Sequence, residues 1–188
     1  MTHDAQPART AGDPNWIRIG AIVVLAIVVA VIVWLIVKDD NNNNDKKSGP
    51  PPASAATVGT LRTLPGQLGH PVYWAGTRTS YTYELTQVNG NVFIRYLPSG
   101  VSVGDPRPNF LTVGSYPGKS YGALKRQASK RGNRSVSGAQ GTTVFWSQDR
   151  PQSVYIIRPG SNIQVEVYDP SAARARRLAT SGAVKQLR

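Results

Sequence analysis

A short glycine-flanked segment carries the sequence pattern of a nucleophilic serine. Residues 118–122 have the sequence Gly-Lys-Ser-Tyr-Gly, which fits G-x-S-x-G, the turn that presents a serine between a strand and a helix. Such a serine needs a histidine base and an acid that orients the base. His70 is the one histidine of residues 57–188. It precedes the serine, whereas in the α/β-hydrolase fold, which carries this motif, the histidine follows the serine. Ser120 is therefore expected to cap a helix, and a hydrolase using Ser120 is the least favoured alternative.

The same segment comes close to a phosphate-binding loop. Three residues separate Gly114 from the sequence Gly118-Lys119-Ser120, whereas the motif requires four. Nucleotide hydrolysis is therefore not expected. A simple anion site at the start of the following helix, assisted by Lys119, stays open.

The remaining residue types offer little for acid–base or metal chemistry. Cysteine is absent, and His70 is followed by Pro71 with no acid beside it, so no metal site is predicted. Glu84 and Glu166 lie on different predicted strands, and their apolar neighbours predict that both face solvent. Paired-carboxylate hydrolysis needs two acids at one cleft. We therefore assign no catalytic residue, metal or cofactor.

Positive charge is the strongest functional signal. The net charge is +12, and residues 57–188 hold all of the excess, with 17 basic residues against five acidic ones. Such a surface attracts polyanions in a salt-dependent way. The alternative interpretation is that these basic residues form only an ordinary solvated helix face and bind no particular partner. The candidate anion-binding residues lie in and beside two predicted helices: Lys119, Lys125, Arg126, Lys130, Arg131, Arg174 and Arg177.

A long apolar run near the N-terminus predicts a membrane anchor. It begins at Ile19, ends at Val37 and contains no charge. As a helix it spans about 28 Å, close to the hydrocarbon thickness of a bilayer. Trp16 and Trp34 lie near its ends, where indole rings favour the interface. The run is longer than the about 7–15 residues of a signal-peptide core. We predict an uncleaved transmembrane helix over residues 17–38, in contact with the lipid bilayer.

The anchor divides the chain into four parts. Residues 1–16 form a short polar tail, residues 39–56 a polar Asn/Pro/Ala spacer, and residues 57–188 a folded domain. Flanking charges set the orientation weakly, but long domains translocate largely regardless of charge. We expect the C-terminal domain outside the cell membrane, where nucleic acid is not an expected partner.

Short β-type runs and two helices predict an α+β domain. Strands are predicted at 72–74, 81–87, 92–97, 110–113, 144–146, 154–157 and 163–168, with an Asn-Gly hairpin at 89–90. One helix is predicted over 120–131. A second runs to about residue 181, with Asp169 as N-cap and Pro170 at the first position. We expect antiparallel strands with the helices on one face.

Similar residues recur at an interval of 72 positions. Val72-Tyr73-Trp74 corresponds to Val144-Phe145-Trp146 at that interval, Tyr83 to Tyr155, and Tyr96 to Tyr168. The interval suggests a duplicated strand-strand-strand-helix unit, with chance similarity of two hairpins as the alternative.

The overall layout resembles single-pass envelope proteins of actinobacteria. The residues that carry the resemblance are the anchor, the spacer, the sequence Gly69-His70-Pro71-Val72-Tyr73-Trp74 and the sequence Val165-Glu166-Val167-Tyr168-Asp169-Pro170. The resemblance implies no known activity. Because the residue inventory argues against an enzyme, our first hypothesis is a non-enzymatic domain that binds a protein partner, anionic lipid or anionic wall polymer. The alternative is a sensor or regulatory subunit of a membrane complex, although a tail of about 16 residues leaves no room for a folded cytoplasmic effector.

Overall fold

The computed structural model describes residues 52–188. The predicted tail, the predicted transmembrane helix over 17–38 and most of the predicted spacer lie outside these residues. None of the helices within residues 52–188 combines the length and the apolar character that crossing a membrane requires.

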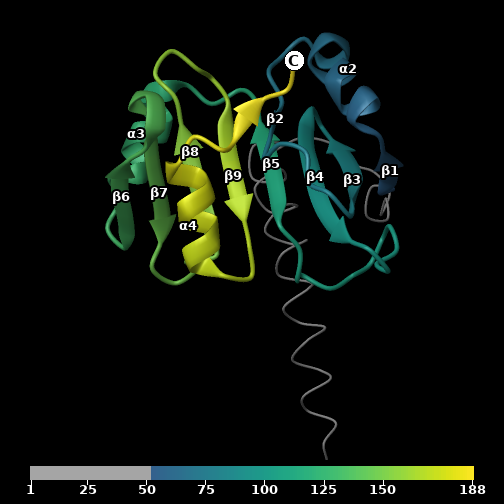
Figure 1. Cartoon of the computed structure of the whole chain (residues 1–188). Helices are drawn as coiled ribbons and strands as arrows, with labels where there is room; N and C mark the ends of the chain where they lie inside the picture. The colour runs from purple at the N-terminus through teal and green to yellow at the C-terminus, as the bar shows by residue number, and fades with distance from the viewer. Residues whose placement is uncertain (1–51) are drawn as a thin grey trace, which may run out of the picture. The chain divides into compact units, whose positions relative to one another are not determined.

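One antiparallel sheet forms the centre of the described domain (Figure 1). Its strand order is β1-β3-β4-β5-β9-β8-β7-β6, and every neighbouring pair runs antiparallel. The strands are β1 (Ser54–Ala56), β3 (Tyr81–Val88), β4 (Asn91–Pro98), β5 (Thr112–Tyr116), β6 (Asn133–Ser137), β7 (Thr143–Ser147), β8 (Ser153–Ile157) and β9 (Gln164–Tyr168). A second, small sheet pairs β2 (Tyr73–Trp74) with β10 (Lys185–Gln186). The predicted α+β class with antiparallel strands is confirmed.

Two elements at the start of the domain were not predicted. Helix α2 (Val58–Leu68) begins where the Thr57 hydroxyl accepts a hydrogen bond from the Thr60 amide, and it buries Leu61 and Leu64. Strand β1 pairs with β3. The sheet thus includes residues 54–56, which lie within the predicted spacer over 39–56.

The helices lie on both faces of the sheet, so the prediction of helices on one face is wrong. Neighbouring residues of β7 point to opposite faces. Val144 belongs to the main core, together with Ala175 and Ala179 of α4 (Ala172–Thr180). Phe145 packs instead against Leu124 of α3 (Tyr121–Ala128). Helix α2 contributes to the same core as α4, and Figure 1 shows α4 in front of β8 and β9.

The predicted duplication interval does not match equivalent strands. The sheet consists of two four-stranded halves, β1-β3-β4-β5 and β6-β7-β8-β9, and the meanders β3-β4-β5 and β7-β8-β9 within them meet where β5 pairs with β9. An interval of 72 residues relates β3 to β8 and β4 to β9. Strands β3 and β4 are the first and second of their meander, whereas β8 and β9 are the second and third of theirs. The aromatic residues at that interval therefore do not mark a structural repeat.

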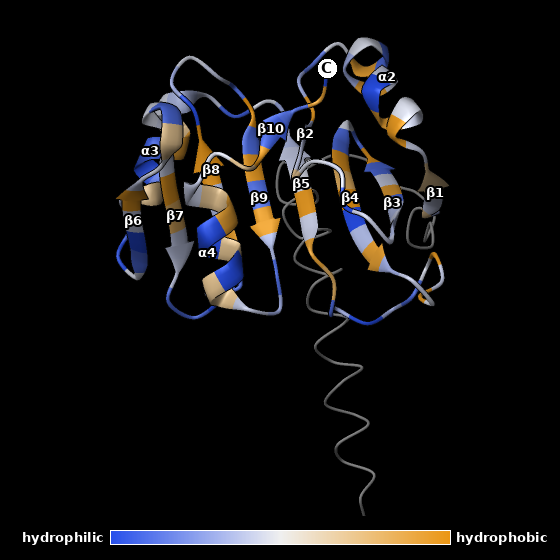
Figure 2. Cartoon of the chain, in the orientation of Figure 1, coloured by the Kyte–Doolittle hydropathy of each residue, from blue (hydrophilic) through white to orange (hydrophobic). Residues whose placement is uncertain are grey.

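Several predicted boundaries shift by a few residues. Strand β5 begins at Thr112, so Phe110 and Leu111 precede it. Helix α4 has Ser171 as its N-cap in place of Asp169. The Asp169 carboxylate instead accepts a hydrogen bond from the Ser171 amide at 2.8 Å. Figure 2 shows a mostly hydrophobic β8, and alternating hydrophilic and hydrophobic positions on β9 and on α4.

Glu84 is buried, which overturns its predicted solvent exposure. It is 1% exposed, and its Oε1 accepts from Arg95 Nη1 at 2.6 Å. The Gly104 amide donates to Oε2 at 2.6 Å. Arg95 also donates to the backbone oxygens of Asp105 and Arg107, each at 3.0 Å. The loop over residues 99–111 thus folds across this part of β3 and β4, and alternation along a single strand cannot anticipate that cover.

We predict that Glu84→Ala lowers the free energy of unfolding by about 3–5 kcal/mol, because it leaves the Arg95 charge without its buried partner. Denaturant unfolding of the full chain in nonionic detergent measures this loss. Asp105→Asn is the matched control, since it breaks the more exposed ion pair between Asp105 and Arg107 in the same loop and is expected to cost much less. Equal losses in the two variants would contradict the buried-pair interpretation.

Candidate anion-binding cleft

The structure divides the predicted anion-binding residues into two groups on opposite faces of the sheet. Arg174 and Arg177 are exposed on α4. The other group belongs to α3 and its flanking turns: Lys119, Lys125, Arg126, Lys130 and Arg131. Since α3 and α4 pack on opposite faces, the continuous basic surface that one-sided helices would have formed is absent from the described domain.

The α3 group lies on exposed elements. Helix α3 ends at Ala128, before the predicted end at residue 131. Lys130 and Arg131 therefore lie in the turn before β6 and not in the helix. Lys125 and Arg126 are exposed, and Lys119 is half-buried. None of these five residues lines the cleft beside α4 that is described below.

Ser120 caps α3 as predicted. Its hydroxyl accepts a hydrogen bond from the Ala123 amide at 3.3 Å. The ring nitrogens of His70 lie 3.1 and 2.9 Å from the carbonyl oxygens of Pro71 and Gly90, so they contact the backbone and not the serine. Within residues 52–188, no group of three or more acidic or histidine side chains is arranged to hold a metal ion.

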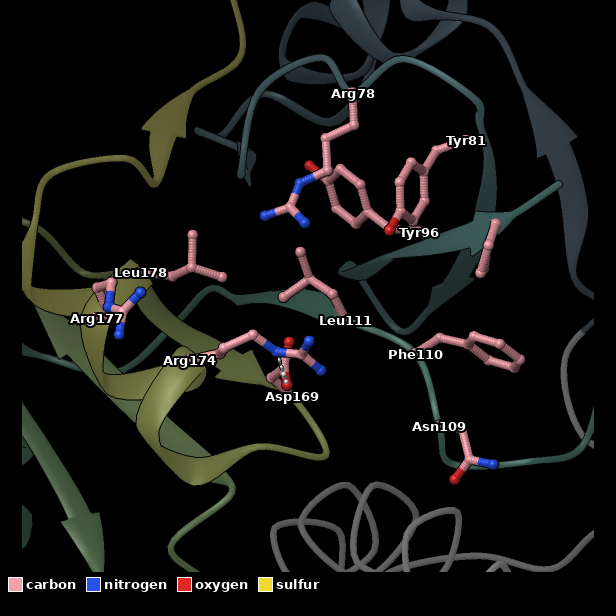
Figure 3. A pocket seen from close by; sticks show the side chains of 11 residues that line it. Arg78, Tyr81, Tyr96, Asn109, Phe110, Leu111, Asp169, Arg174, Arg177 and Leu178 are labelled. Atoms are coloured by element: carbon pink, nitrogen blue, oxygen red, sulfur yellow. Dashed lines mark hydrogen bonds and ion pairs between the residues drawn. The ribbon is translucent and has the colours of Figure 1, made fainter.

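A cleft of about 230 Å³ opens beside α4, where β3 begins, β4 ends and the chain leaves β9 (Figure 3). Its basic and polar lining comes from both halves of the domain. Arg174 and Arg177 come from α4, and Arg78 comes from the loop between β2 and β3. The full lining is Arg78, Tyr81, Tyr96, Pro98, Asn109, Phe110, Leu111, Asp169, Arg174, Arg177 and Leu178.

Positive charge predominates in this cleft. Three arginines line it, but only one carboxylate, that of Asp169. Asp169 Oδ1 accepts from Arg174 Nε at 3.0 Å, which leaves both terminal nitrogens of Arg174 without a hydrogen bond to residues 52–188. Within the same residues, Arg78 and Arg177 form no ion pair. The cleft therefore offers several free N–H donors to an anion.

Two tyrosine hydroxyls hold the loop that carries Arg78. The Arg78 amide donates to the Tyr83 hydroxyl at 2.8 Å, and the Ala75 amide donates to the Tyr96 hydroxyl at 2.7 Å. The guanidinium carbon of Arg78 lies 5.4 Å from the Tyr96 ring centroid and 5.9 Å from that of Tyr81. Burial raises the pKa of Tyr96 well above its usual value, so the hydroxyl stays neutral. The position of Arg78 is thus fixed by the core below it.

Sequence reasoning missed Arg78 because its position depends on tertiary contacts. The residue stands alone in a loop, outside any basic cluster. The one local signal is its nearness to Tyr81 and to the aromatic strand that follows. Tyr83 and Tyr96 lie on separate strands, and only their pairing brings both hydroxyls beneath the loop.

A second polar cluster lies on the α3 face and is part of the packing. The Tyr116 hydroxyl donates to the carboxylate of Glu166. Glu166 is half-buried and therefore less solvated than the sequence pattern predicted. Burial, followed by the Glu166 charge, raises the pKa of both Tyr116 and Tyr155. Gly114 leaves room for the Tyr116 ring, since a Cβ there would lie 2.9 Å from that ring. The two phenols therefore stay protonated as donors.

Comparison of the chain with protein-family models, with curated proteins and with solved structures yields no match in any of the three.

We predict that Ser120→Ala lowers the free energy of unfolding by about 0.5–2 kcal/mol, because α3 loses its N-terminal cap, and leaves anion binding unchanged. Ser171→Ala removes the corresponding cap of α4, whose hydroxyl accepts from the Arg174 amide at 3.4 Å. It is expected to cost similar stability and also to weaken anion binding, since α4 carries Arg174 and Arg177. Thermal unfolding and a polyanion-binding assay measure the two effects. Loss of binding in a stably folded Ser120→Ala protein would contradict a purely structural role.

Proposed function

We propose that this protein is a membrane-anchored, non-catalytic binding protein whose extracytoplasmic domain recognises an anionic envelope polymer or partner. The observation that carries the proposal is the convergence of Arg78, Arg174 and Arg177 on one cleft that contains a single carboxylate. Arginine presents a planar fork of donors that matches carboxylate and phosphate groups.

The charge and layout of the chain support this function. The domain has 17 basic residues and only five acidic ones, and this excess of positive charge favours long-range attraction of polyanions. The apolar run from Ile19 to Val37 and the polar spacer fit a domain tethered at a bilayer. The resemblance to actinobacterial envelope proteins agrees with this placement.

The arrangement of the domain favours binding through α4 over binding through α3. Both helices carry exposed basic residues, but those of α4 line a cleft and one of them is held by Asp169. Preoriented side chains lose less conformational freedom on binding. We therefore assign recognition to the cleft and general attraction to the remaining charge.

We predict that the full chain in nonionic detergent binds immobilised polyglycerol phosphate at low salt and is released as salt rises. The double variant R174Q/R177Q is expected to bind on the order of tenfold more weakly, because two charge-assisted contacts are lost. The variant K125Q/R126Q removes the same charge from α3 and is the matched control, expected to bind nearly as the parent does. Equal weakening in both variants would assign binding to net charge alone, and absence of binding by the parent would contradict the function.

A second prediction concerns orientation. Protease added to intact cells after removal of the wall should digest the domain and leave a fragment near residues 1–50, because the spacer offers accessible sites. Immunoblotting against an N-terminal tag detects this fragment. Complete protection of the domain, with cleavage restored by detergent, would contradict the extracytoplasmic assignment.

A further inference from the structure

The cleft beside α4 offers more than positive charge. Arg78 and Arg174 extend into it from opposite sides, one from the β2–β3 loop and one from α4 (Figure 3). The bond from Arg174 Nε to Asp169 at 3.0 Å fixes one edge of that guanidinium. Its terminal N–H groups remain free for a second partner. Two guanidinium groups that lie on opposite sides of one cleft favour a single compact oxyanion between them.

Uncharged groups beside the arginines point to a ligand with hydroxyl groups. Asn109 contributes an amide, which both donates and accepts hydrogen bonds. Asp169 Oδ2 has no hydrogen-bond partner within residues 52–188 and can accept one. The Asp169 carboxylate would repel a bare polyanion locally, whereas its Oδ2 accepts readily from a hydroxyl group. The lining thus combines oxyanion and hydroxyl recognition.

Aromatic and aliphatic side chains form the rest of the cleft. Tyr81 is 37% exposed, and it is one of two large hydrophobic residues, with Val136, that are exposed at the surface of the described domain. Phe110, Leu111 and Leu178 complete this apolar lining. An exposed aromatic ring covers the C–H face of a sugar well, because the ring is rigid and amphipathic. A phosphate or carboxylate ion alone would leave this apolar part of the cleft in contact with water.

The size of the cleft limits the ligand. Its volume of about 230 Å³ lies below the about 300–1,000 Å³ of pockets that enclose drug-sized molecules. One ring with its substituents is therefore the largest unit that the cleft encloses. A longer chain would extend out of the open side.

We infer that the cleft binds one sugar ring that carries an oxyanion, as a uronate or as a sugar phosphate, either free or as a unit of a polymer. This inference rests on the proposed function and names its ligand class. Arg78 and Arg174 hold the oxyanion, Asn109 and Asp169 hydrogen-bond to ring hydroxyls, and the Tyr81 ring packs against the sugar. Arg177 adds charge at the α4 side.

The test is NMR with the full chain in nonionic detergent. Saturation-transfer difference spectra and titrations use D-glucuronic acid and glucose 6-phosphate as probes, with glucose, inorganic phosphate and acetate as comparisons. We expect the acidic sugars to bind at least about tenfold more tightly than glucose or either free ion, with the strongest saturation at ring protons. Binding no tighter than that of inorganic phosphate or acetate would overturn the inference.

Variants locate the site. R78Q and Y81A should each weaken binding of the acidic sugars about tenfold or more, whereas K125Q/R126Q should leave it unchanged. R177Q is a second variant on an exposed position, in case R78Q disturbs the β2–β3 loop, and it should weaken binding severalfold. Equal effects of R177Q and K125Q/R126Q would overturn the assignment to the cleft.

The two proposals fail in different ways. If polyglycerol phosphate binds in a manner that depends on Arg174 and Arg177 but no acidic sugar does, the proposed function stands and the sugar inference is wrong. Comparison of galacturonic acid with polygalacturonate distinguishes a free sugar from a polymer unit, since only the polymer gains affinity from several adjacent units.

Discussion

The pairing of β5 with β9 is the contact on which the rest of the domain depends. It joins the two four-stranded halves of the sheet through a register that runs from Thr112 opposite Tyr168 to Tyr116 opposite Gln164. The main core draws residues from both halves. Joined at this seam, Val113, Val165 and Val167 enter one core with α2 and α4. The cleft depends on the same seam, because Tyr81 and Tyr96 come from one meander while Arg174 follows the last strand of the other.

Local signals in the sequence were sufficient for most of the sheet. Alternation predicted 81–87 and 92–97, and the Asn-Gly turn between them predicted their pairing, which the structure shows as β3 and β4. The expected Ser120 cap likewise located the start of α3, whereas the predicted start of α4 was two residues early. Helix α2 was missed although Leu61, Leu64 and Leu68 have helical spacing, because Pro65 and two glycines argue against a helix there. Strand β6 was missed because nearly all its residues are exposed at the sheet edge, so its sequence carries no alternation.

Tertiary placement was beyond the reach of single-element patterns. Each helix showed an apolar stripe, but no stripe specifies which sheet face it covers. Both faces of β7 and β8 are apolar: Val144 and Val154 enter one cluster, Phe145 and Ile157 the other. That double-sided pattern was the available signal for helices on both faces. The burial of Glu84 had no such signal, since its partner Arg95 and the covering loop meet it only after β3 and β4 pair.

Charge count alone does not make a site, and the use of the carboxylates shows why. Glu84 pairs with Arg95 between β3 and β4, and the two side chains hydrogen-bond to the backbone of the loop over residues 99–111. Within that loop, Asp105 pairs with Arg107. Asp169 pairs with Arg174 and orients it beside the cleft. The scarce acids are thus used for geometry, and the surplus of arginine remains at the surface. On α3 that surplus lies on an exposed helix, where water solvates it fully. Beside α4 it lies next to an aromatic ring and the β2–β3 loop. The arginines there line a cleft of defined shape, which can discriminate between anions.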